Sequence, residues 1–190
     1  MMRLLLLSLL SLVCFITSGC DDDDTPDTPV AFLGRFEGWQ LAVIESDLES
    51  QLSTAILGIP DSTLQRYGTS RESLLAFADT TVAITVGLDP CEQDDVVFFN
   101  EGVVAYGQAG EACPDGSLPS VLLPFDKNAY ATDLDVTDLT ITDPTTQTSS
   151  VYRVDLLTES QFVISQLRRV PEAPPVPAYQ YSITYRFVAR

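Results

Sequence analysis

The chain has no histidine, and Lys127 is the single lysine among its 190 residues. Without histidine it lacks the commonest general base, which excludes Ser-His-Asp and Cys-His nucleophilic systems and the usual zinc sites. Lys127 lies in the polar stretch Asp126-Lys127-Asn128 and lacks the Ser-x-x-Lys spacing of a lysine-assisted serine acylase. An enzyme would have to work through carboxylates alone, and no pair stands out among 27 acidic residues. We therefore predict no catalytic residues, no cofactor and no enzymatic activity.

Basic residues are scarce, with ten against the 27 acids, so the formal charge is -17. A chain this acidic is repelled by phosphate backbones and by anionic lipid surfaces. Nucleic-acid binding is therefore excluded.

The long apolar runs that mark membrane spans are also missing, apart from a short one near the start. Arg3 precedes the thirteen apolar-rich residues 4–16, and Ser18-Gly19-Cys20 follows them. Thirteen residues are too few to cross a bilayer of about 30 Å, and small residues at the end are typical of a signal peptidase site. Residues 1–19 are predicted to be a signal peptide, and their removal with Arg3 leaves nine basic residues and a charge near -18.

Cys20 then becomes the first residue of the mature chain. This pattern resembles a bacterial lipoprotein signal, which implies acylation of Cys20 and a membrane as the first partner. The alternative is an ordinary secretory cut that leaves Cys20 free or disulfide-bonded. In residues 20–31, Cys20 is followed by four aspartates, and two prolines come later, so we predict an extended, solvated tether.

A lipid followed by an acidic run resembles the export signal of surface lipoproteins in the Bacteroidota. The resemblance implies an outer-membrane lipid anchor exposed on the cell surface, with the periplasmic face as the alternative. The simpler interpretation of the run is a soluble spacer.

Cysteine usage agrees with export. Cys14 leaves with the signal peptide, so Cys91 and Cys113 remain as the thiols of residues 32–190, which we predict to be one domain. In an oxidising compartment an isolated pair predicts a disulfide.

Two helices are predicted after a first strand over residues 36–44, which contains Trp39. Ser46-Asp47-Leu48-Glu49 has the form of a capping box, and Thr69-Ser70-Arg71-Glu72 repeats it. From Thr80 the period changes to two, which predicts a strand through Val82, Ile84 and Val86. A hairpin is predicted across Asn100-Glu101-Gly102, where the glycine suits a bulged turn. Further strands are predicted over residues 120–125, 138–142, 151–157, 161–168 and 179–187.

This pattern predicts a mainly β fold, an antiparallel up-and-down barrel of about eight strands with two short helices inserted after the first strand, or else a sandwich. The Trp39 strand after Gly34, the acidic segment after Cys91, the hairpin and Cys113-Pro114 together resemble the lipocalin-like domains of Bacteroidota lipoproteins. The resemblance implies a barrel over residues 32–190.

An eight-stranded barrel is just wide enough either to fill with side chains or to hold one small ligand. Core packing is the ordinary role of an alternating aromatic strand, and a ligand cavity is the functional one. The candidate ligand-binding residues are Trp39, Phe98 or Phe99, Tyr179, Tyr181, Tyr185 and Phe187.

Two functional hypotheses follow. The first is a binding module for a small hydrophobic or glycan-derived ligand, and the second is a structural or interaction lipoprotein with a filled barrel and an envelope protein partner. Asp133 to Asp138 carry carboxylates at positions 1, 3 and 6 but lack the glycine and glutamate of a calcium loop. No metal is therefore predicted.

Overall fold

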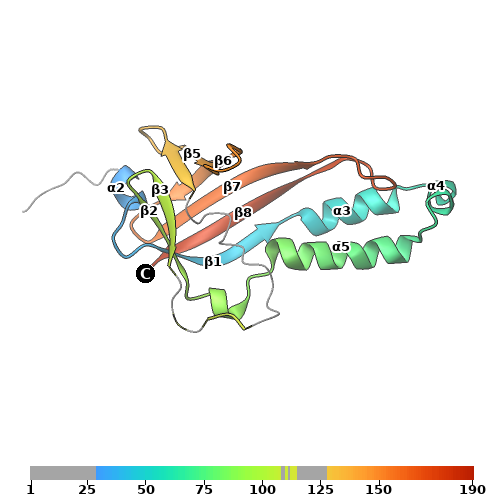
Figure 1. The fold of residues 1–190 in the computed structure, drawn as a ribbon, viewed down its shortest axis with the longest axis horizontal. Helices are drawn as coiled ribbons and strands as arrows, with labels where there is room; N and C mark the ends of the chain where they lie inside the picture. Colours follow the sequence, from blue (N-terminus) through green and yellow to red (C-terminus); the bar gives the residue numbers. More distant parts are fainter. Residues whose placement is uncertain (1–28, 108–109, 111, 115–127) are drawn as a thin grey trace, which may run out of the picture.

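The computed structural model describes residues 29–107, 110, 112–114 and 128–190, and these form a closed antiparallel barrel (Figure 1). Each strand pairs with the next along the chain, and β1 closes the barrel against β8. The predicted up-and-down barrel is thereby confirmed. Its strands are β1 (Trp39–Ser46), β2 (Val96–Asn100), β3 (Val103–Gly107), β4 (Ala129–Thr132), β5 (Asp138–Thr142), β6 (Ser149–Leu157), β7 (Gln161–Val170) and β8 (Tyr179–Ala189).

The last strand shows the predicted alternation most clearly. Along β8, Tyr181, Ile183, Tyr185 and Phe187 are buried, while the residues between them face outward. β7 pairs with β8 along its whole length, from Gln161 to Val170. Because side chains in a strand alternate between faces, this ladder places one row of β7 residues inside the barrel beside the β8 row.

The β2–β3 hairpin is present where predicted, with a different turn. Asn100 pairs with Val103, so the loop is Glu101-Gly102 alone, and both residues have positive φ angles, 49° and 79°. Two positive φ values in a two-residue loop are typical of a type I′ turn, whose twist matches that of the strands. The predicted bulge is therefore absent from this hairpin.

The first strand begins at Trp39, three residues later than predicted. The amide of Gly38 donates to the carbonyl of Arg35 and closes a turn ahead of the strand. Gly38 has a φ of 75°, and a Cβ there would overlap the side chains of Val96 and Phe98. Only glycine fits this position without strain.

The helical insertion differs from the prediction in number and extent. Between β1 and β2 the structure has α3 (Leu48–Leu57), α4 (Asp61–Arg66), α5 (Arg71–Val86) and the 3-10 turn η1 (Pro90–Glu92). Figure 1 shows α3 and α5 side by side, extending away from the barrel. A further helix, α2 (Pro29–Leu33), precedes β1 and takes in the last three residues of the predicted tether.

The strand predicted from Thr80 is wrong, because α5 continues to Val86. Val82 and Val86, which alternate in sequence, are also four residues apart, so both lie on one helix face and pack against the core. The hydroxyls of Thr81 and Thr85 donate to the carbonyls of Phe77 and Thr81, one turn earlier. The β-branched run therefore satisfies its polar groups within the helix.

The two capping boxes also form differently. Ser70, one residue after the predicted cap, accepts from the amide of Ser73 and starts α5. At α3 the N-cap residue is Asp47, whose carboxylate makes no capping bond to a backbone amide of the helix. It accepts from the amide of Ser182 at 2.6 Å and from the Ser182 hydroxyl at 3.1 Å. Asp47 thus fastens the start of α3 to β8.

Replacement of Asp47 by alanine should lower the free energy of unfolding by about 1 kcal/mol at pH 7, since a charge-assisted hydrogen bond is lost. Burial acts to raise the pKa of Asp47, and the hydrogen bonds from Ser182 and Gln51 outweigh it and hold that pKa below its ordinary value. The contribution is therefore fully present above the unfolded-state pKa of about 4 and disappears as the pH falls through the lower folded-state pKa. Urea denaturation at pH 7 and pH 3 measures both points. Asp47→Asn, which keeps an acceptor oxygen, should lose less at pH 7; an equal loss would contradict this role.

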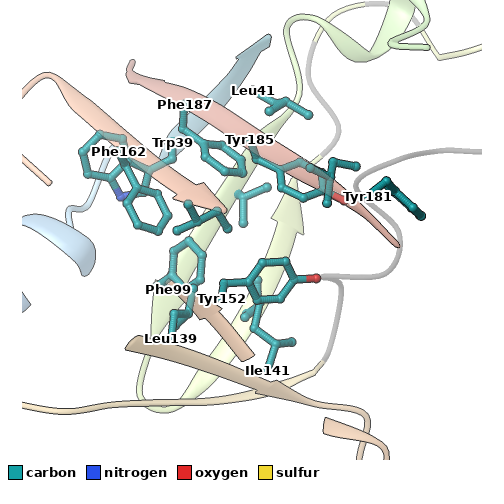
Figure 2. Close-up of a cluster of buried hydrophobic side chains, with 14 of the residues drawn as sticks. Trp39, Leu41, Phe99, Leu139, Ile141, Tyr152, Phe162, Tyr181, Tyr185 and Phe187 are labelled. Atoms are coloured by element: carbon teal, nitrogen blue, oxygen red, sulfur yellow. The ribbon is translucent and has the colours of Figure 1, made fainter. Parts of the chain in front are cut away.

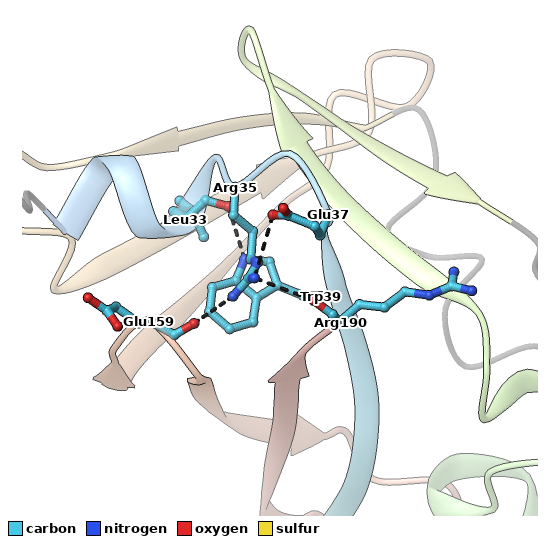
Figure 3. Close-up of polar contacts among 6 residues, drawn as sticks. All are labelled: Leu33, Arg35, Glu37, Trp39, Glu159 and Arg190. Atoms are coloured by element: carbon cyan, nitrogen blue, oxygen red, sulfur yellow. Dashed lines mark hydrogen bonds and ion pairs between the residues drawn. The ribbon is translucent and has the colours of Figure 1, made fainter. Parts of the chain in front are cut away.

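One end of the barrel is sealed by α2 and the turn that follows it. The indole nitrogen of Trp39 donates to the carbonyl of Leu33 at 3.0 Å, and both side chains are buried. The guanidinium of Arg35 lies 5.2 Å from the Trp39 ring centroid and donates to the carbonyl of Glu159 (Figure 3). We call this the sealed end of the barrel.

Aromatic side chains fill the interior next to the seal (Figure 2). The ring of Phe162 stacks on Phe187 at a centroid distance of 5.4 Å, and contacts Trp39 at 5.5 Å and Phe99 at 5.6 Å. These four side chains are at most 1% exposed. Offset and edge-to-face geometries at these distances are the favourable ones for aromatic pairs. This half of the barrel is a packed core.

Candidate functional site

The interior changes character toward the opposite end, which we call the open end. Along the inner row of β7 the residues run Phe162, Ile164, Gln166 and Arg168, from apolar to charged. The inner row of β8 supplies Tyr185 and Tyr181 alongside. An arginine on the inner face of a barrel strand is unusual, because charged groups are rarely buried unless they are paired.

Arg168 lies among three tyrosines from two neighbouring strands. It is opposite Tyr181 in the β7–β8 ladder, and its Nη2 atom donates to the Tyr185 hydroxyl at 3.3 Å. Its Nε atom donates to Oε1 of Gln166 at 2.8 Å. Tyr152 of β6 packs edge-to-face on Tyr185 at a centroid distance of 6.1 Å, and Figure 2 shows its hydroxyl pointing away from the aromatic core. Gln166 and the phenols hold the guanidinium at the open end.

The cluster carries one positive charge at neutral pH. Burial raises the pKa of Tyr185 to about 12, although the nearby Arg168 acts to lower it. Burial likewise raises the pKa of Tyr152. For Arg168 itself, burial acts to lower the pKa, but Tyr185 and the other phenols outweigh it and the pKa is raised. The tyrosines therefore stay neutral hydrogen-bonding groups while the arginine stays charged.

Within the described part of the chain, no carboxylate forms an ion pair with Arg168. The ion pairs seen there use Arg35, Arg71, Arg153 and Arg186 instead. In a protein with 27 acidic residues and ten basic ones, this arrangement leaves the positive charge of Arg168 to phenol and amide oxygens. A guanidinium without a carboxylate partner can attract an anion that reaches it.

A pocket of about 360 Å³ opens beside Arg168. Its wall combines Arg168 and Tyr152 with amide, hydroxyl and carboxylate groups from Asn128, Asp143, Thr146, Thr148 and Ser150, and with Ile141. The Asp143 carboxylate caps its own turn, accepting from the amide of Thr145 at 2.7 Å and the hydroxyl of Thr146 at 2.8 Å, and these bonds lower its pKa. The pocket is thus lined by both polar and apolar surface, with several hydroxyl groups and the ring of Tyr152.

The structure separates the six predicted ligand-binding residues. Trp39, Tyr181, Tyr185 and Phe187 all belong to one buried core cluster. Within it, Tyr181 and Tyr185 lie beside Arg168, whereas Trp39 and Phe187 contact Phe162. Phe98 faces outward and covers Gly38 and Gly107, while its neighbour Phe99 faces inward. Tyr179 is half-buried and borders a separate surface pocket between α3 and β8.

Sequence reasoning missed Arg168 and Tyr152. Arg168 was assigned to the end of a strand before a proline-rich loop. β7 in fact continues to Val170, and the alternation of Phe162, Ile164 and Gln166 carries Arg168 to the inner face. A charged residue in phase with an apolar row was the signal available. Tyr152 had no comparable signal, since β6 has few buried residues.

The predicted cysteine pair is confirmed at disulfide distance, with Cα atoms of Cys91 and Cys113 5.2 Å apart. Asp89 lies beside the two sulfurs with the spacing of a metal site. Bonding of the sulfurs to each other removes the thiolates that would bind a metal, so we assign the pair a structural role. Cys20, the signal peptide and the strand predicted over residues 120–125 lie outside the described residues.

The acidic stretch beginning at Asp133 forms a turn. The Asp133 carboxylate accepts from the amide of Thr137 at 2.7 Å and from its hydroxyl, and these bonds hold the pKa of Asp133 below its usual value despite some desolvation. Both of its oxygens therefore close the β4–β5 connection.

Helix α5 presents an apolar face that no described element covers. Phe77 is 64% exposed and Ile84 43% exposed, and both lie on the side away from α3 and the barrel. The segment Arg71–Glu92 is apolar and long enough to cross a membrane by composition. However, α5 itself has 16 residues, or about 24 Å, and carries Asp79 at its centre. We therefore treat it as a surface helix with an exposed apolar side.

A scan against protein-family models and searches of the curated proteins and of the solved structures give no match to this chain.

Proposed function

We propose that this protein is a membrane-anchored, lipocalin-like lipoprotein whose barrel binds a small glycan-derived acid at its open end, without catalysing a reaction. The observation that carries the proposal is Arg168, a positive charge held by phenols and an amide on the wall of a pocket that also presents several hydroxyl groups. The anchor is the acylated Cys20 predicted from the sequence.

The lining of the pocket determines the class of ligand. A volume of about 360 Å³ is near the lower end of the range of ligand pockets, so the ligand is small. Hydroxyl and amide groups on the wall match the hydroxyls of a sugar, and the face of Tyr152 can pack on its ring. Arg168 matches one carboxylate, while the Asp143 carboxylate on the rim disfavours a second negative charge. A sugar acid with a single carboxylate satisfies all three features.

Replacement of Arg168 by glutamine should weaken binding of glucuronate or galacturonate by roughly 10- to 100-fold, since a hydrogen-bonded charge pair contributes about 1.5–3 kcal/mol. Isothermal titration calorimetry with the purified protein measures this change. Arg168→Lys should recover part of the loss, because it keeps the charge without the planar fork. Glucose and galactose, which lack the carboxylate, should bind the native protein as weakly as the acids bind Arg168→Gln.

The matched control is Arg169→Gln, one position further along the same strand. Arg169 is exposed on the outer face of β7. This variant loses the same charge from the protein, so it reports the general electrostatic effect without touching the pocket. Equal weakening by both variants, or binding of a medium-chain fatty acid in place of the sugar acids, would contradict the proposed ligand.

The second candidate is an interaction lipoprotein with a filled barrel, and the exposed face of α5 favours it. Exposed apolar side chains such as Phe77 and Ile84 on one helix face are compatible with a protein contact. If neither sugar acids nor fatty acids bind the native protein in the calorimeter, this candidate replaces the first.

A further inference from the structure

The sealed end of the barrel carries the two most exposed large apolar side chains of the described residues. Phe36 is 93% exposed and Leu134 is 91% exposed. Phe36 lies in the turn between α2 and β1, and Leu134 lies in the β4–β5 connection. Isolated exposed apolar residues are ordinary, but two that are almost fully exposed to solvent in loops at one end of the barrel need a physical explanation.

Topology places these two loops at the same end. In an up-and-down barrel the connections alternate between the two ends, so the segment before β1 lies with the β2–β3, β4–β5 and β6–β7 connections. The hydrogen bond from Arg35 to the carbonyl of Glu159 joins the segment before β1 to the β6–β7 connection. Figure 1 shows α2 and the β2–β3 turn at this end, with α4 at the far opposite end.

The sealed end is also where the chain enters the barrel. Nine residue steps separate Cys20 from Pro29, the first residue of α2. Their greatest reach is about 30 Å, at 3.3–3.6 Å per residue. A lipid on Cys20 therefore keeps the sealed end within about 30 Å of the bilayer surface.

A groove of about 750 Å³ runs beneath Phe36, between it and the half-buried ring of Phe98. Arg35 and Arg190 border the same groove, so the apolar rings are accompanied by two of the ten basic residues. Aromatic side chains flanked by arginine are suited to a headgroup region, where the ring meets acyl chains and the guanidinium stays hydrated. Figure 3 shows the Arg35 side chain lying over Trp39.

Carboxylates at this end restrict the kind of membrane. Glu37, Glu101, Asp133, Asp135 and Glu159 are all exposed there, and Glu37 forms an ion pair with Arg35 at 3.5 Å. These charges are repelled by anionic lipids, which leaves a bilayer of zwitterionic lipid as the surface that the end fits.

We infer that the sealed end docks on the bilayer, with Phe36 and Leu134 inserted at the level of the headgroups. This inference rests on the anchoring of Cys20 in the proposed function. The docked barrel directs its open end, with Arg168, away from the membrane.

The test uses the acylated mature protein reconstituted in phosphatidylcholine vesicles that contain brominated acyl chains, which quench nearby tryptophan fluorescence. The native Trp39 is fully buried and gives the background signal. In Phe36→Trp and in Leu134→Trp, the added fluorescence should fall by about half relative to vesicles without bromine, since interfacial side chains reach roughly 5–10 Å into the boundary region. Both original residues are more than 90% exposed, so neither variant disturbs the core.

Leu167→Trp is the matched control, because Leu167 is 69% exposed on the outer face of β7, next to Arg168 and away from the sealed end. Its added fluorescence should be unchanged by bromine. Flotation of the vesicles distinguishes failure of the lipid anchor from failure of the docking. Protein that floats with the vesicles while Phe36→Trp and Leu134→Trp are not quenched overturns the docking alone. Protein that does not float overturns the anchor and the docking together.

Discussion

Replacement of Phe162 by alanine is expected to destabilise the protein by about 4 kcal/mol, within the range of 3–5 kcal/mol found for buried phenylalanines. Phe162 has no exposed surface and contacts three further aromatic rings within 5.6 Å. Truncation removes its own burial, leaves a cavity in the middle of the cluster and breaks the ring contacts with Trp39, Phe99 and Phe187. For a domain of this size the melting temperature should fall by roughly 8–16 °C.

Thermal and urea denaturation followed by circular dichroism measure this loss. Phe77→Ala is the control, because it truncates the same residue type on the exposed face of α5, where Phe77 is 64% exposed. That variant should change stability by less than about 0.5 kcal/mol. A comparable loss in both variants would mean that the sealed end is not the stabilising core.

Removal of both Cys91 and Cys113 is expected to have the second largest effect, a loss of about 3 kcal/mol. Their separation of 22 residues sets this value in the chain-entropy account of a disulfide. The bridge joins η1, ahead of β2, to the segment after β3. It therefore links the start of the β2–β3 hairpin to its finish.

The β2–β3 hairpin depends on this bridge because it pairs with its neighbouring strands, β1 and β4, at only a few positions. β1 pairs with β2 at two positions, Trp39 with Val97 and Gln40 with Val96, and β3 pairs with β4 only between Val103 and Ala129. Without the bridge, amides of β2 and β3 should exchange hydrogen sooner than those of the long β7–β8 ladder.

Hydrogen exchange of the double alanine variant measures this difference. Reduction of the native protein should reproduce the loss, and the variant should not respond to reductant. Uniform acceleration across all strands would instead indicate that the bridge stabilises the barrel as a whole.

The sequence predicted the barrel well where alternation was strict. β8 shows a clear two-residue period, and β5 begins and ends where predicted, at Asp138 and Thr142. In these strands one face is buried and the other is exposed to solvent, so the alternation of apolar and polar residues directly predicts which side chains face inward.

Prediction failed where two periods share the same residues. Val82, Ile84 and Val86 alternate, but Val82 and Val86 also lie one helical turn apart, and packing against α3 decides for the helix. β4 was not predicted because Ala129–Thr132 has four residues and no buried apolar one. Tertiary pairing with β5, rather than local preference, makes it a strand.

The candidate site was only half predictable for a related reason. The phase of an alternating strand shows that Tyr181 and Tyr185 face inward, but it does not show which end of the barrel is packed. That asymmetry comes from α2 and Trp39, whose contact spans six residues of a turn that no periodic pattern describes. Arg168 becomes a candidate binding residue only once the structure shows that the opposite end of the barrel is sealed.

The seal at Leu33 and Trp39 restricts the route by which a ligand could enter the barrel. With the proposed orientation, the mouth nearest the lipid is blocked by an indole and a helix, so no molecule can pass from the bilayer through the barrel. Under the proposed function, the ligand would exchange with the surrounding water, so we propose a collector of dissolved solutes and not a shuttle for lipids.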